Sequence, residues 1–548
     1  MFFRVTRAGR HQYVQIARSY RDGTTVKQQT LLSLGRLDVL QASGQLDALL
    51  RSGLRLSDRL AVLDAHAADQ TEAVALQKIG PELVFGRLWE QTGIAKALAE
   101  QLARRRYDFA VERAIVLTVL HRLFGSGSDR AAERWRDAYR IPGVEALELH
   151  HLYRAMAFLG EPLPHAPRVL GSPRCVKDLI EEALFERRRD LFTAVDLVFF
   201  DTTSIYFEGR GGQTLGRYGH SKDHRRDLRQ MIVGIALDSA GWPLCCELWP
   251  GNTTDVKTLL PVVARLQHRF RVRAVCILAD RGMISKQTIT DLEQAEPPLR
   301  YILGARMRRQ KEVAETVLTS PGGWQEVYPP RRGSKDPAPL QVREVVVKGR
   351  RYIVCLNEEE RRKDAHDRAA IVAHLRHQLT QGDKSLVGNK GYRRFLRLEG
   401  PGHFAVDDAR VTAEARFDGI WVLRTNTDCP TATVALQYKR LWMVEAMIRT
   451  TKAILETRPI YHKCDETIRG HVFCSFLALL LKAELEKRLE VRGEDWEWAE
   501  VLRGLDNLQE VAAVFRGRRY LLRSQFTGQA YTAIRAAGVA IPPTIREV

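Results

Sequence analysis

The segment VDLVFFDTTSIYF, residues 195–207, decides the fold of the central part of this 548-residue chain. Its apolar run of Val, Leu and Phe predicts a buried strand that ends at an acid, Asp201. A second apolar run, VRAVCILAD (272–280), predicts another buried strand, which also ends at an acid, Asp280. Open α/β sheets place their functional sites at the carboxyl ends of strands. We therefore expect Asp201 and Asp280 to belong to one site.

The sequence around these strands predicts the rest of the sheet. Residues 230–252 predict two further strands joined by a tight turn, and residues 254–270 predict a helix. After the second acid, residues 285–295 predict a helix and residues 300–305 a last strand. The order β-β-β-α-β-α-β, a three-strand meander followed by βαβ units, predicts an α/β fold with a mixed sheet.

A third acid lies in YKRLWMVEAMIRTTK, residues 438–452, which predicts one helix. Apolar residues at helical spacing predict its buried face: Leu441, Val444 and Ile448. Glu445 departs from this face. Tyr438 lies seven residues before Glu445 and Lys452 seven residues after it, and seven residues are nearly two helical turns. On one continuous helix these three side chains would form a single stripe.

Arg449, four residues after Glu445, joins the same stripe. The simplest interpretation of these two residues is an exposed ion pair, which is common on helices. The strand acids have similarly plain alternatives, because Asp201 can cap the turn DTTS and Asp280 can pair with Arg281. The functional interpretation depends on the joint appearance of all three acids in this topology.

Three carboxylates that converge repel one another unless a cation neutralises them. Carboxylate oxygens suit Mg²⁺ and Mn²⁺, and two such ions about 3.5–4 Å apart assist phosphoryl transfer. The sequence has no GxSxG motif for a nucleophilic serine and no GxxxxGK[ST] loop for NTP hydrolysis. We therefore expect Asp201, Asp280 and Glu445 to bind two Mg²⁺ or Mn²⁺ ions over a phosphodiester.

The charge of the chain favours a polyanionic partner. There are 85 Lys and Arg against 66 Asp and Glu, which gives a net charge of +19 and a pI of about 9.7, a balance typical of nucleic-acid-binding proteins. The 8 cysteines form no CxxC pair. Because no segment resembles a signal peptide or a membrane span, we expect a reduced, soluble, cytoplasmic protein with no membrane partner.

Changes in pattern divide the chain into six parts. Short β-rich runs predict a meander at the N-terminus, and a mostly helical, basic region after it is interpreted as the DNA-binding region. A β-rich segment interrupts the sheet domain as an insertion. In order, the parts are the meander with its linker (1–62), the helical region (75–192), the first part of the core (193–308), the insertion (309–418), the second part of the core (419–492) and a basic C-terminal region (493–548).

Six motifs together resemble the bacterial DDE insertion-sequence transposases. The resemblance covers residues 195–490 and is closest to the group with a β-rich insertion between the second Asp and the Glu, which carries a Tyr, Arg, Glu, Lys signature around the last acid. The motifs are, in order, FFDTTSIYFEG (199–209), SKDHRRDLRQMIVGIALDSAGWPL (221–244), ELWPGNTTDVKTL (247–259), ILADRGMIS (277–285), LRTN (423–426) and YKRLWMVEAMIRTTKAILETRPIYH (438–462).

The resemblance implies a ribonuclease-H-like fold and Mg²⁺-dependent cleavage and strand transfer of DNA at element ends. It implies that Asp201, Asp280 and Glu445 are the metal-binding triad. Tyr438 and Lys452 match the signature positions that hold DNA phosphate near the cut. The signature Arg is expected four residues before the Glu, where this chain has Leu441; the neighbouring Arg440 points about 100° away on an ideal helix, and Arg449 is the better-placed cation.

Other residues have a functional and a plain interpretation. Trp442 is either a platform for an unpaired base, as aromatics are in related enzymes, or a core residue, and the core is favoured. Lys222 and Arg226 lie in a polar loop that either contacts DNA or is simply solvated. Asp255 is expected to cap a helix.

The main hypothesis is a DNA transposase that acts on double-stranded DNA, namely the terminal inverted repeats of an element and its target. The family implies a homodimer on DNA, in the cytoplasm and associated with the nucleoid. Two alternatives stay open: a junction or structure-selective nuclease on the same fold, and a non-catalytic DNA-binding repressor derived from a transposase.

Overall fold

The computed structural model of the chain forms two compact units, each described here by itself. The larger unit consists of residues 81–497 and 532–539, and the smaller one of residues 1–80, 498–531 and 540–548. The structure describes residues 1–22, 25–54, 72–125, 127–164, 173–188, 197–270, 276–280, 285–296, 298–331, 336–381, 393–400, 403–453, 458–515 and 518–548.

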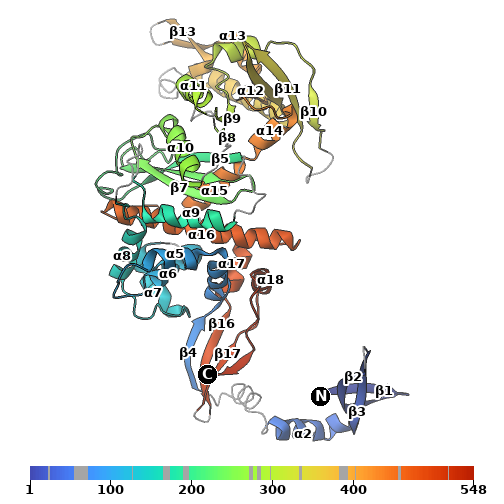
Figure 1. Cartoon of the computed structure of the whole chain (residues 1–548). Coiled ribbons are helices and arrows are strands. Elements are labelled where there is room, and N and C mark those ends of the chain that lie inside the picture. Colours follow the sequence, from blue (N-terminus) through green and yellow to red (C-terminus); the bar gives the residue numbers. More distant parts are fainter. Residues whose placement is uncertain are drawn as a thin grey trace. The chain divides into compact units, whose positions relative to one another are not determined.

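A nine-stranded sheet is the centre of the larger unit, with the order β10-β11-β12-β15-β9-β8-β5-β6-β7 (Figure 1). β5, β6 and β7 pair antiparallel, whereas β8 pairs parallel with both β5 and β9. This confirms the expected mixed sheet and its ribonuclease-H-like arrangement of a meander followed by parallel strands. The elements of this part are β5 (Leu197–Tyr206), β6 (Gln230–Leu237), β7 (Pro243–Pro250), α10 (Leu259–Phe270), β8 (Cys276–Ala279), α11 (Lys286–Gln294) and β9 (Arg300–Gly304).

Side chains alternate between the two faces of this sheet, and a separate apolar core forms on each face. On one face Val198, Phe200 and Ile277 pack in the core that includes α10 and α11. On the other face Ile205 packs in a core with Ile468 of α16 (Asp465–Val491). Helix α15 (Trp442–Ala453) contacts β5 and β6.

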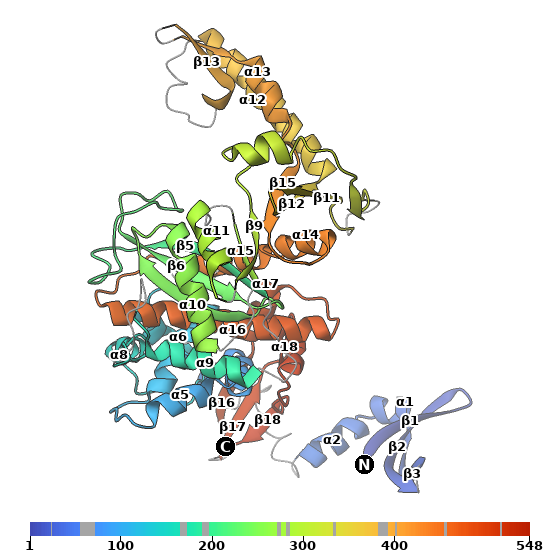
Figure 2. The same ribbon diagram turned by 45° about the horizontal axis from the view of Figure 1, so that its top comes forward.

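Three strands of the insertion, β10, β11 and β12, extend the main sheet, whereas β13 and β14 form a separate two-stranded sheet. β12 pairs antiparallel with β15, and β15 pairs antiparallel with β9, so the strands of the insertion continue the sheet at the β9 edge (Figure 2). The elements of the insertion are β10 (Gln325–Tyr328), β11 (Leu340–Val347), β12 (Arg350–Leu356), α12 (Glu358–Gln381), β13 (Leu396–Gly400), β14 (His403–Val406) and α13 (Asp408–Ala415). The core resumes with β15 (Ile420–Thr425) and α14 (Thr431–Lys439).

Helices before the sheet pack against α16. Helices α4, α6 and α8 contact α16, and most apolar residues of α16 are buried. No described helix is long and apolar enough to cross a membrane. The helices of this region are α4 (Arg87–Thr92), α5 (Ile94–Leu102), α6 (Val111–Phe124), α7 (Asp129–Trp135), α8 (Leu149–Leu159) and α9 (Val176–Arg188). The DNA-binding role of this region stays a prediction.

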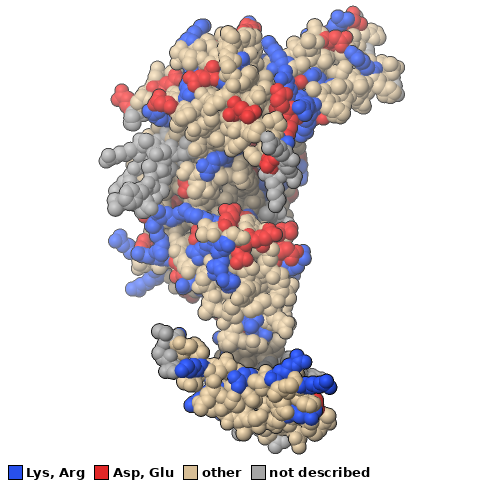
Figure 3. All heavy atoms as spheres, turned by 90° about the vertical axis from the view of Figure 1, so that its right-hand side faces the viewer, with Lys and Arg blue, Asp and Glu red and all other residues tan. Residues whose placement is uncertain are grey.

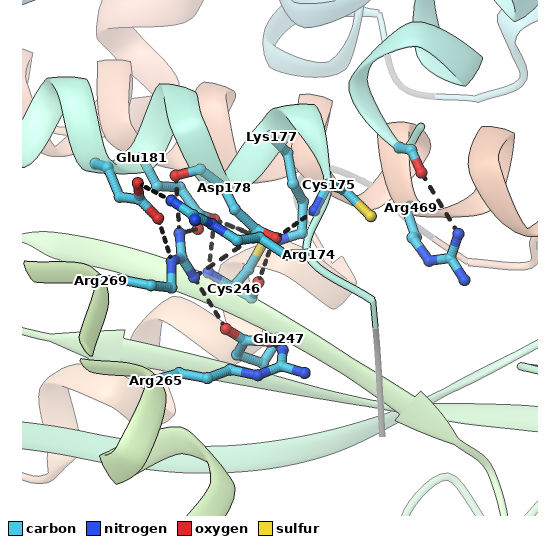
Figure 4. Close-up of polar contacts among 12 residues, drawn as sticks. Arg174, Cys175, Lys177, Asp178, Glu181, Cys246, Glu247, Arg265, Arg269 and Arg469 are labelled. Carbon is cyan, nitrogen blue, oxygen red and sulfur yellow. Dashed lines mark hydrogen bonds and ion pairs between the residues drawn. The ribbon is translucent and has the colours of Figure 1, made fainter. Parts of the chain in front are cut away.

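A buried ion-pair network joins α9 to β7 and α10 (Figure 4). Arg269 of α10 lies 2.5 Å from Glu181 of α9 and 3.0 Å from Glu247 of β7. Lys177 of α9 lies 2.6 Å from Asp178 and donates to the Cys246 carbonyl at 2.7 Å. Because each buried charge has an opposite partner, the network fixes how the last helix before the sheet docks on it.

The smaller unit contains two antiparallel sheets. One has the order β1-β2-β3 and is the expected N-terminal meander; the other has the order β18-β17-β16-β4. Its elements are β1 (Phe2–Ala8), β2 (His11–Asp22), β3 (Thr25–Arg36), α1 (Leu37–Ala42), α2 (Gln45–Leu54), β4 (Glu72–Lys78), α17 (Trp498–Asp506), β16 (Gln509–Phe515), β17 (Arg518–Arg523) and β18 (Ile545–Glu547). The last helix, α18 (Ala530–Ala536), is divided between the two units.

Candidate active site

Asp201 and Asp280 occupy equivalent positions on neighbouring parallel strands. Phe199 of β5 pairs with Leu278 of β8, and each acid lies two residues beyond its member of this pair. Neighbouring strands are about 4.8 Å apart. The expectation that the strand ends at Asp201 is wrong, because β5 continues to Tyr206 through its pairing with β6. Asp201 is therefore not a turn cap; it lies in the strand, just past the end of its pairing with β8.

Both acids point to the face of the sheet that carries α15. Val198 and Phe200 pack on the opposite face, and Ile277 and Ala279 pack there too. Because side chains alternate along a strand, Asp201 and Asp280 point away from that core. The pairing of Asp280 with Arg281 falls on residue 281, which lies outside the described residues.

Glu445 lies on the exposed side of α15. The apolar face of this helix is buried as expected, with Leu441, Val444 and Ile448 exposed by 9% or less. Among the described residues, the side chain of Glu445 has no hydrogen-bond or ion-pair partner, so the expected pair with Arg449 is absent. Glu445 thus keeps a free carboxylate on the helix that packs against the strand of Asp201.

The expected single helix over 438–452 is wrong, because the segment forms two helices, α14 and α15. Arg440 has ψ of −6°, and the backbone N–H of Leu441 donates to Tyr438 three residues back. This tight turn redirects the chain, since an α-helix bonds four residues back. Tyr438 therefore does not share a helical stripe with Glu445, whereas Lys452 does.

Tyr438 reaches the site from the end of α14. Its hydroxyl donates to Oδ1 of Asp280 at 3.4 Å, so the structure brings these two predicted residues together by a route other than helical spacing. The phenol can orient the Asp280 carboxylate.

Asp255 is the site residue whose role the sequence did not reveal. Instead of capping a helix through its side chain, it accepts a hydrogen bond from the Thr202 hydroxyl at 2.8 Å and lies 3.2 Å from Nζ of Lys222. Lys222 also donates to the Thr202 carbonyl at 2.6 Å. The fold thus places the Asp255 carboxylate and the Lys222 ammonium group beside Asp201. Only the motif NTTD marked Asp255 in the sequence.

Burial raises the pKa of the Asp201 carboxyl to about 6, and the nearby Asp280 and Asp255 carboxylates raise it further. The Lys222 ammonium and the Thr202 N–H, which donates to Asp201 at 2.7 Å, act in the opposite direction. A buried acid held among other acids favours the arrival of a cation, because a cation replaces the proton and relieves the repulsion.

Lys452 is held in an ion-pair cluster at the end of α15. Its Nζ lies 2.8 Å from Oδ1 of Asp223, and Arg458 lies 2.6 Å from the same oxygen. Burial lowers the pKa of Lys452, and the Asp223 carboxylate counters this effect. The loop that carries Asp223 and Lys222 therefore contacts both the sheet and the region after α15.

Of the remaining residues predicted to contact DNA, three are exposed and one, Arg440, binds a turn of the sheet. Trp442 is 62% exposed, so its interpretation as a core residue is wrong. Arg449 and Arg226 are exposed and have no ion-pair partner among the described residues. Arg440 instead donates to the Ser239 carbonyl in the turn between β6 and β7. Trp442, Glu445 and Arg449 share one side of α15.

The donor set fits hard divalent cations. Asp201, Asp280 and Glu445 offer only carboxylate oxygens, the ligands that Mg²⁺ and Mn²⁺ prefer. Among the described residues, these three acids do not form a group of ligand atoms that all lie within 4.8 Å of one another.

Charge on the surface is distributed over several parts of the molecule. Figure 3 shows Lys and Arg side chains in several separate places on one face, with Asp and Glu side chains among them. The Lys and Arg side chains drawn on this face are scattered, which agrees with the scattered basic clusters of the sequence.

Comparisons with known proteins found two matching family models and a similar solved structure. Residues 195–481 match the family described as the Transposase DDE domain, and residues 3–69 match the IS1634 family transposase, N-terminal domain. A solved structure, the cryo-EM structure of a piggyBac transposase synaptic complex with hairpin DNA, is similar with 12% identity over 78% of each chain and a TM-score of 0.36. A search of curated proteins found no match.

The first of these matches covers more than half of the chain and contains all three acids. It confirms the resemblance to insertion-sequence transposases that the ordered motifs indicated. The chain therefore belongs to the DDE transposases.

Proposed function

We propose that this DDE transposase cleaves double-stranded DNA at the ends of its element and joins the freed 3′-OH to a target, with Asp201, Asp280 and Glu445 as metal ligands. The observation that carries the proposal is the register of β5 and β8, which places the first two acids side by side on the face that α15 covers. Two Mg²⁺ or Mn²⁺ ions bound there would supply Lewis-acid stabilisation of the attacking and leaving oxygens.

The chain's own residues prepare the site for these ions. Tyr438 orients Asp280 through its hydroxyl, and Lys222 places a positive charge beside Asp201. Asp255 holds Lys222 and the Thr202 hydroxyl, so it is a positioning residue rather than a ligand. Glu445, free of partners among the described residues, is available to close on the site from α15.

The DNA path proposed here runs over the exposed side of α15. Arg449 and Arg226 are exposed cations without a described partner, and they suit contacts with phosphate. Trp442 presents an open indole on the same helix and suits stacking on an unpaired base. Cutting two element ends together favours a homodimer on DNA.

The test uses linear DNA that carries the element's terminal inverted repeats. Wild-type protein with Mg²⁺ is expected to cut at the repeat ends and to join them to a target plasmid. Asp201→Asn, Asp280→Asn and Glu445→Gln are each expected to abolish both products while retaining DNA binding. Near-normal cleavage by any one of these variants would remove that residue from the triad, and cleavage without joining by the wild type would favour the nuclease alternative.

A further inference from the structure

Away from the carboxylate site, three metal-ligating side chains converge near the start of α7 and on α16. Asp129 begins α7, His471 lies in α16, and His462 lies in the segment between α15 and α16. Oδ2 of Asp129 lies 3.1 Å from Nε2 of His462 and 3.8 Å from Nδ1 of His471, and the two ring nitrogens lie 3.1 Å apart. All three side chains are only 8–9% exposed.

We propose that Asp129, His462 and His471 bind a divalent transition-metal ion, with Zn²⁺ strongly preferred over Mg²⁺. Two imidazoles and one carboxylate are a donor set that Zn²⁺ accepts and that Mg²⁺ disfavours. Bonds of about 2.0–2.1 Å to a tetrahedral ion place neighbouring ligand atoms roughly 3.3 Å apart. The three separations in the structure, 3.1, 3.1 and 3.8 Å, lie on either side of that value.

The ring nitrogens of this cluster have more polar neighbours than one hydrogen bond each requires. Nδ1 of His471 lies 2.8 Å from the guanidinium of Arg122 and 3.1 Å from Nε2 of His462. A ring nitrogen has either one proton or one lone pair, so Nδ1 of His471 cannot accept fully from both neighbours. Nε2 of His462 is likewise shared between His471 and Asp129. A single cation at the centre would use one lone pair from each of the three ligands.

Arg122 is the charged neighbour that competes with the ion. It lies 3.5 Å from Oδ1 of Asp129, the oxygen that faces away from the two imidazole contacts, and it donates to the Ser475 hydroxyl at 3.2 Å. An ion bound to Nδ1 of His471 displaces the contact of Arg122 with that nitrogen, and the guanidinium keeps its contacts with Asp129 and Ser475. Its positive charge nevertheless weakens ion binding, so removal of the charge should tighten it.

A cavity beside the cluster leaves room for a fourth ligand. It has a volume of about 610 Å³ and is lined by all three ligands. Cys464, two residues after His462, lines the same cavity and is a free thiol. Either this thiolate or a water molecule can complete a four-coordinate site.

Occupation of this site would join three segments that are far apart in the sequence. The ion would link the start of α7 to α16 and to the segment 458–464, whose first residue, Arg458, pairs with Asp223 beside the candidate active site. The proposed role is therefore a structural clamp close to the DNA-cutting centre, chemically distinct from the all-oxygen triad. This inference does not depend on the proposed assignment of the triad.

The test measures Zn²⁺ binding to the untagged full-length chain by equilibrium dialysis in excess Mg²⁺, with Co²⁺ absorption as a second probe of coordination. One Zn²⁺ per chain and the visible spectrum of four-coordinate Co²⁺ are expected. Asp129→Asn and His462→Gln should each weaken binding at least about tenfold, whereas Arg122→Gln should tighten it about tenfold.

Two matched controls separate this site from others. His150→Gln removes an exposed histidine of α8 that lies outside the cluster, and Asp201→Asn alters the triad; both should bind Zn²⁺ as the wild type does. Absence of Zn²⁺ binding by the wild type in excess Mg²⁺, a measurement that requires no variant to fold, would overturn the proposal. Wild-type affinity in folded Asp129→Asn and His462→Gln would overturn it equally.

Discussion

The Nζ of Lys452 lies 2.8 Å from Oδ1 of Asp223, so the cation that we predicted to contact DNA phosphate already has a carboxylate partner. Arg458 contacts the same oxygen. DNA phosphate must therefore compete with Asp223 for both cations, or bind beside this cluster.

Replacement of this carboxylate is expected to strengthen DNA binding. Asp223→Asn frees Lys452 and Arg458, and each new phosphate contact should steepen the dependence of log K on log salt by about 0.9. The measurement is a salt titration of duplex binding by fluorescence anisotropy. Asp227→Asn, which removes an exposed acid of the same loop whose partner among the described residues is Arg225, is the matched control and should change the slope less. Equal slopes for both variants would show that Asp223 does not restrain these cations.

Trp442 is expected to distinguish unpaired from paired DNA. Its indole is 62% exposed on the side of α15 that carries Glu445. Stacking on a base contributes about 1–3 kcal/mol, so Trp442→Ala should weaken binding of DNA with an unpaired base at the cleavage end and leave fully paired duplex nearly unchanged. Trp324→Ala, which alters an exposed tryptophan of the insertion, is the control. A similar loss for both DNA forms would contradict a stacking role.

The topology of the core followed directly from hydrophobic pattern. Fully apolar runs such as that of β8 indicate buried strands, and their order predicted the mixed sheet. The break between α14 and α15 was not predictable, because Arg440 and Leu441 are both compatible with helix and the turn depends on tertiary contacts, including the bond from Arg440 to Ser239. The prediction from helical spacing that Tyr438 shares a stripe with Glu445 is therefore wrong.

The site was predictable to the extent that it follows strand register. Asp201 lies in an apolar strand and Asp280 directly follows one, and an acid is conspicuous at both positions. Asp255 gave no such signal, since an acid before a helix is most often a cap. Its contact with Lys222 joins two loops that are separated by 33 positions and meet only in the folded chain.

Glu82 is expected to make stability depend on pH. Burial raises the pKa of its carboxyl from 4.5 to about 7, and its Oε2 has no hydrogen-bond partner among the described residues. The folded state holds this proton more tightly than the unfolded state does, so the stabilisation is complete below pH 4.5 and is lost as the pH rises through 7. The loss amounts to roughly 3 kcal/mol.

Glu82→Gln should abolish this loss and make the protein more stable than the wild type at pH 8. Urea unfolding at pH 5 and pH 8 measures the effect, with Glu90→Gln as the control because Glu90 is an exposed acid of the neighbouring helix. The same pH dependence in Glu82→Gln and in the wild type would exclude Glu82 as its source.

The buried network around Arg269 is expected to be strongly stabilising as a unit. Arg269 pairs with Glu181 and Glu247, which are at most 2% exposed. Arg269→Met removes a buried partner from each carboxylate, leaving Lys177 beside Glu181 and Arg265 beside Glu247, and should cost about 3–5 kcal/mol of unfolding free energy. Arg300→Met removes one partner of an exposed pair, Arg300 with Asp428, and should cost at most about 1 kcal/mol. Equal losses in denaturant unfolding would show that burial does not govern the network.

The central claim is that Asp201, Asp280 and Glu445 jointly bind divalent ions over DNA. A crystal structure of the chain bound to element-end DNA and Mn²⁺, with anomalous scattering to locate the metal, tests it most directly. The account predicts two manganese peaks, each within about 2.0–2.3 Å of a carboxylate oxygen of this triad. Manganese bound elsewhere, with the three carboxylates free of metal beside the scissile phosphate, would contradict it.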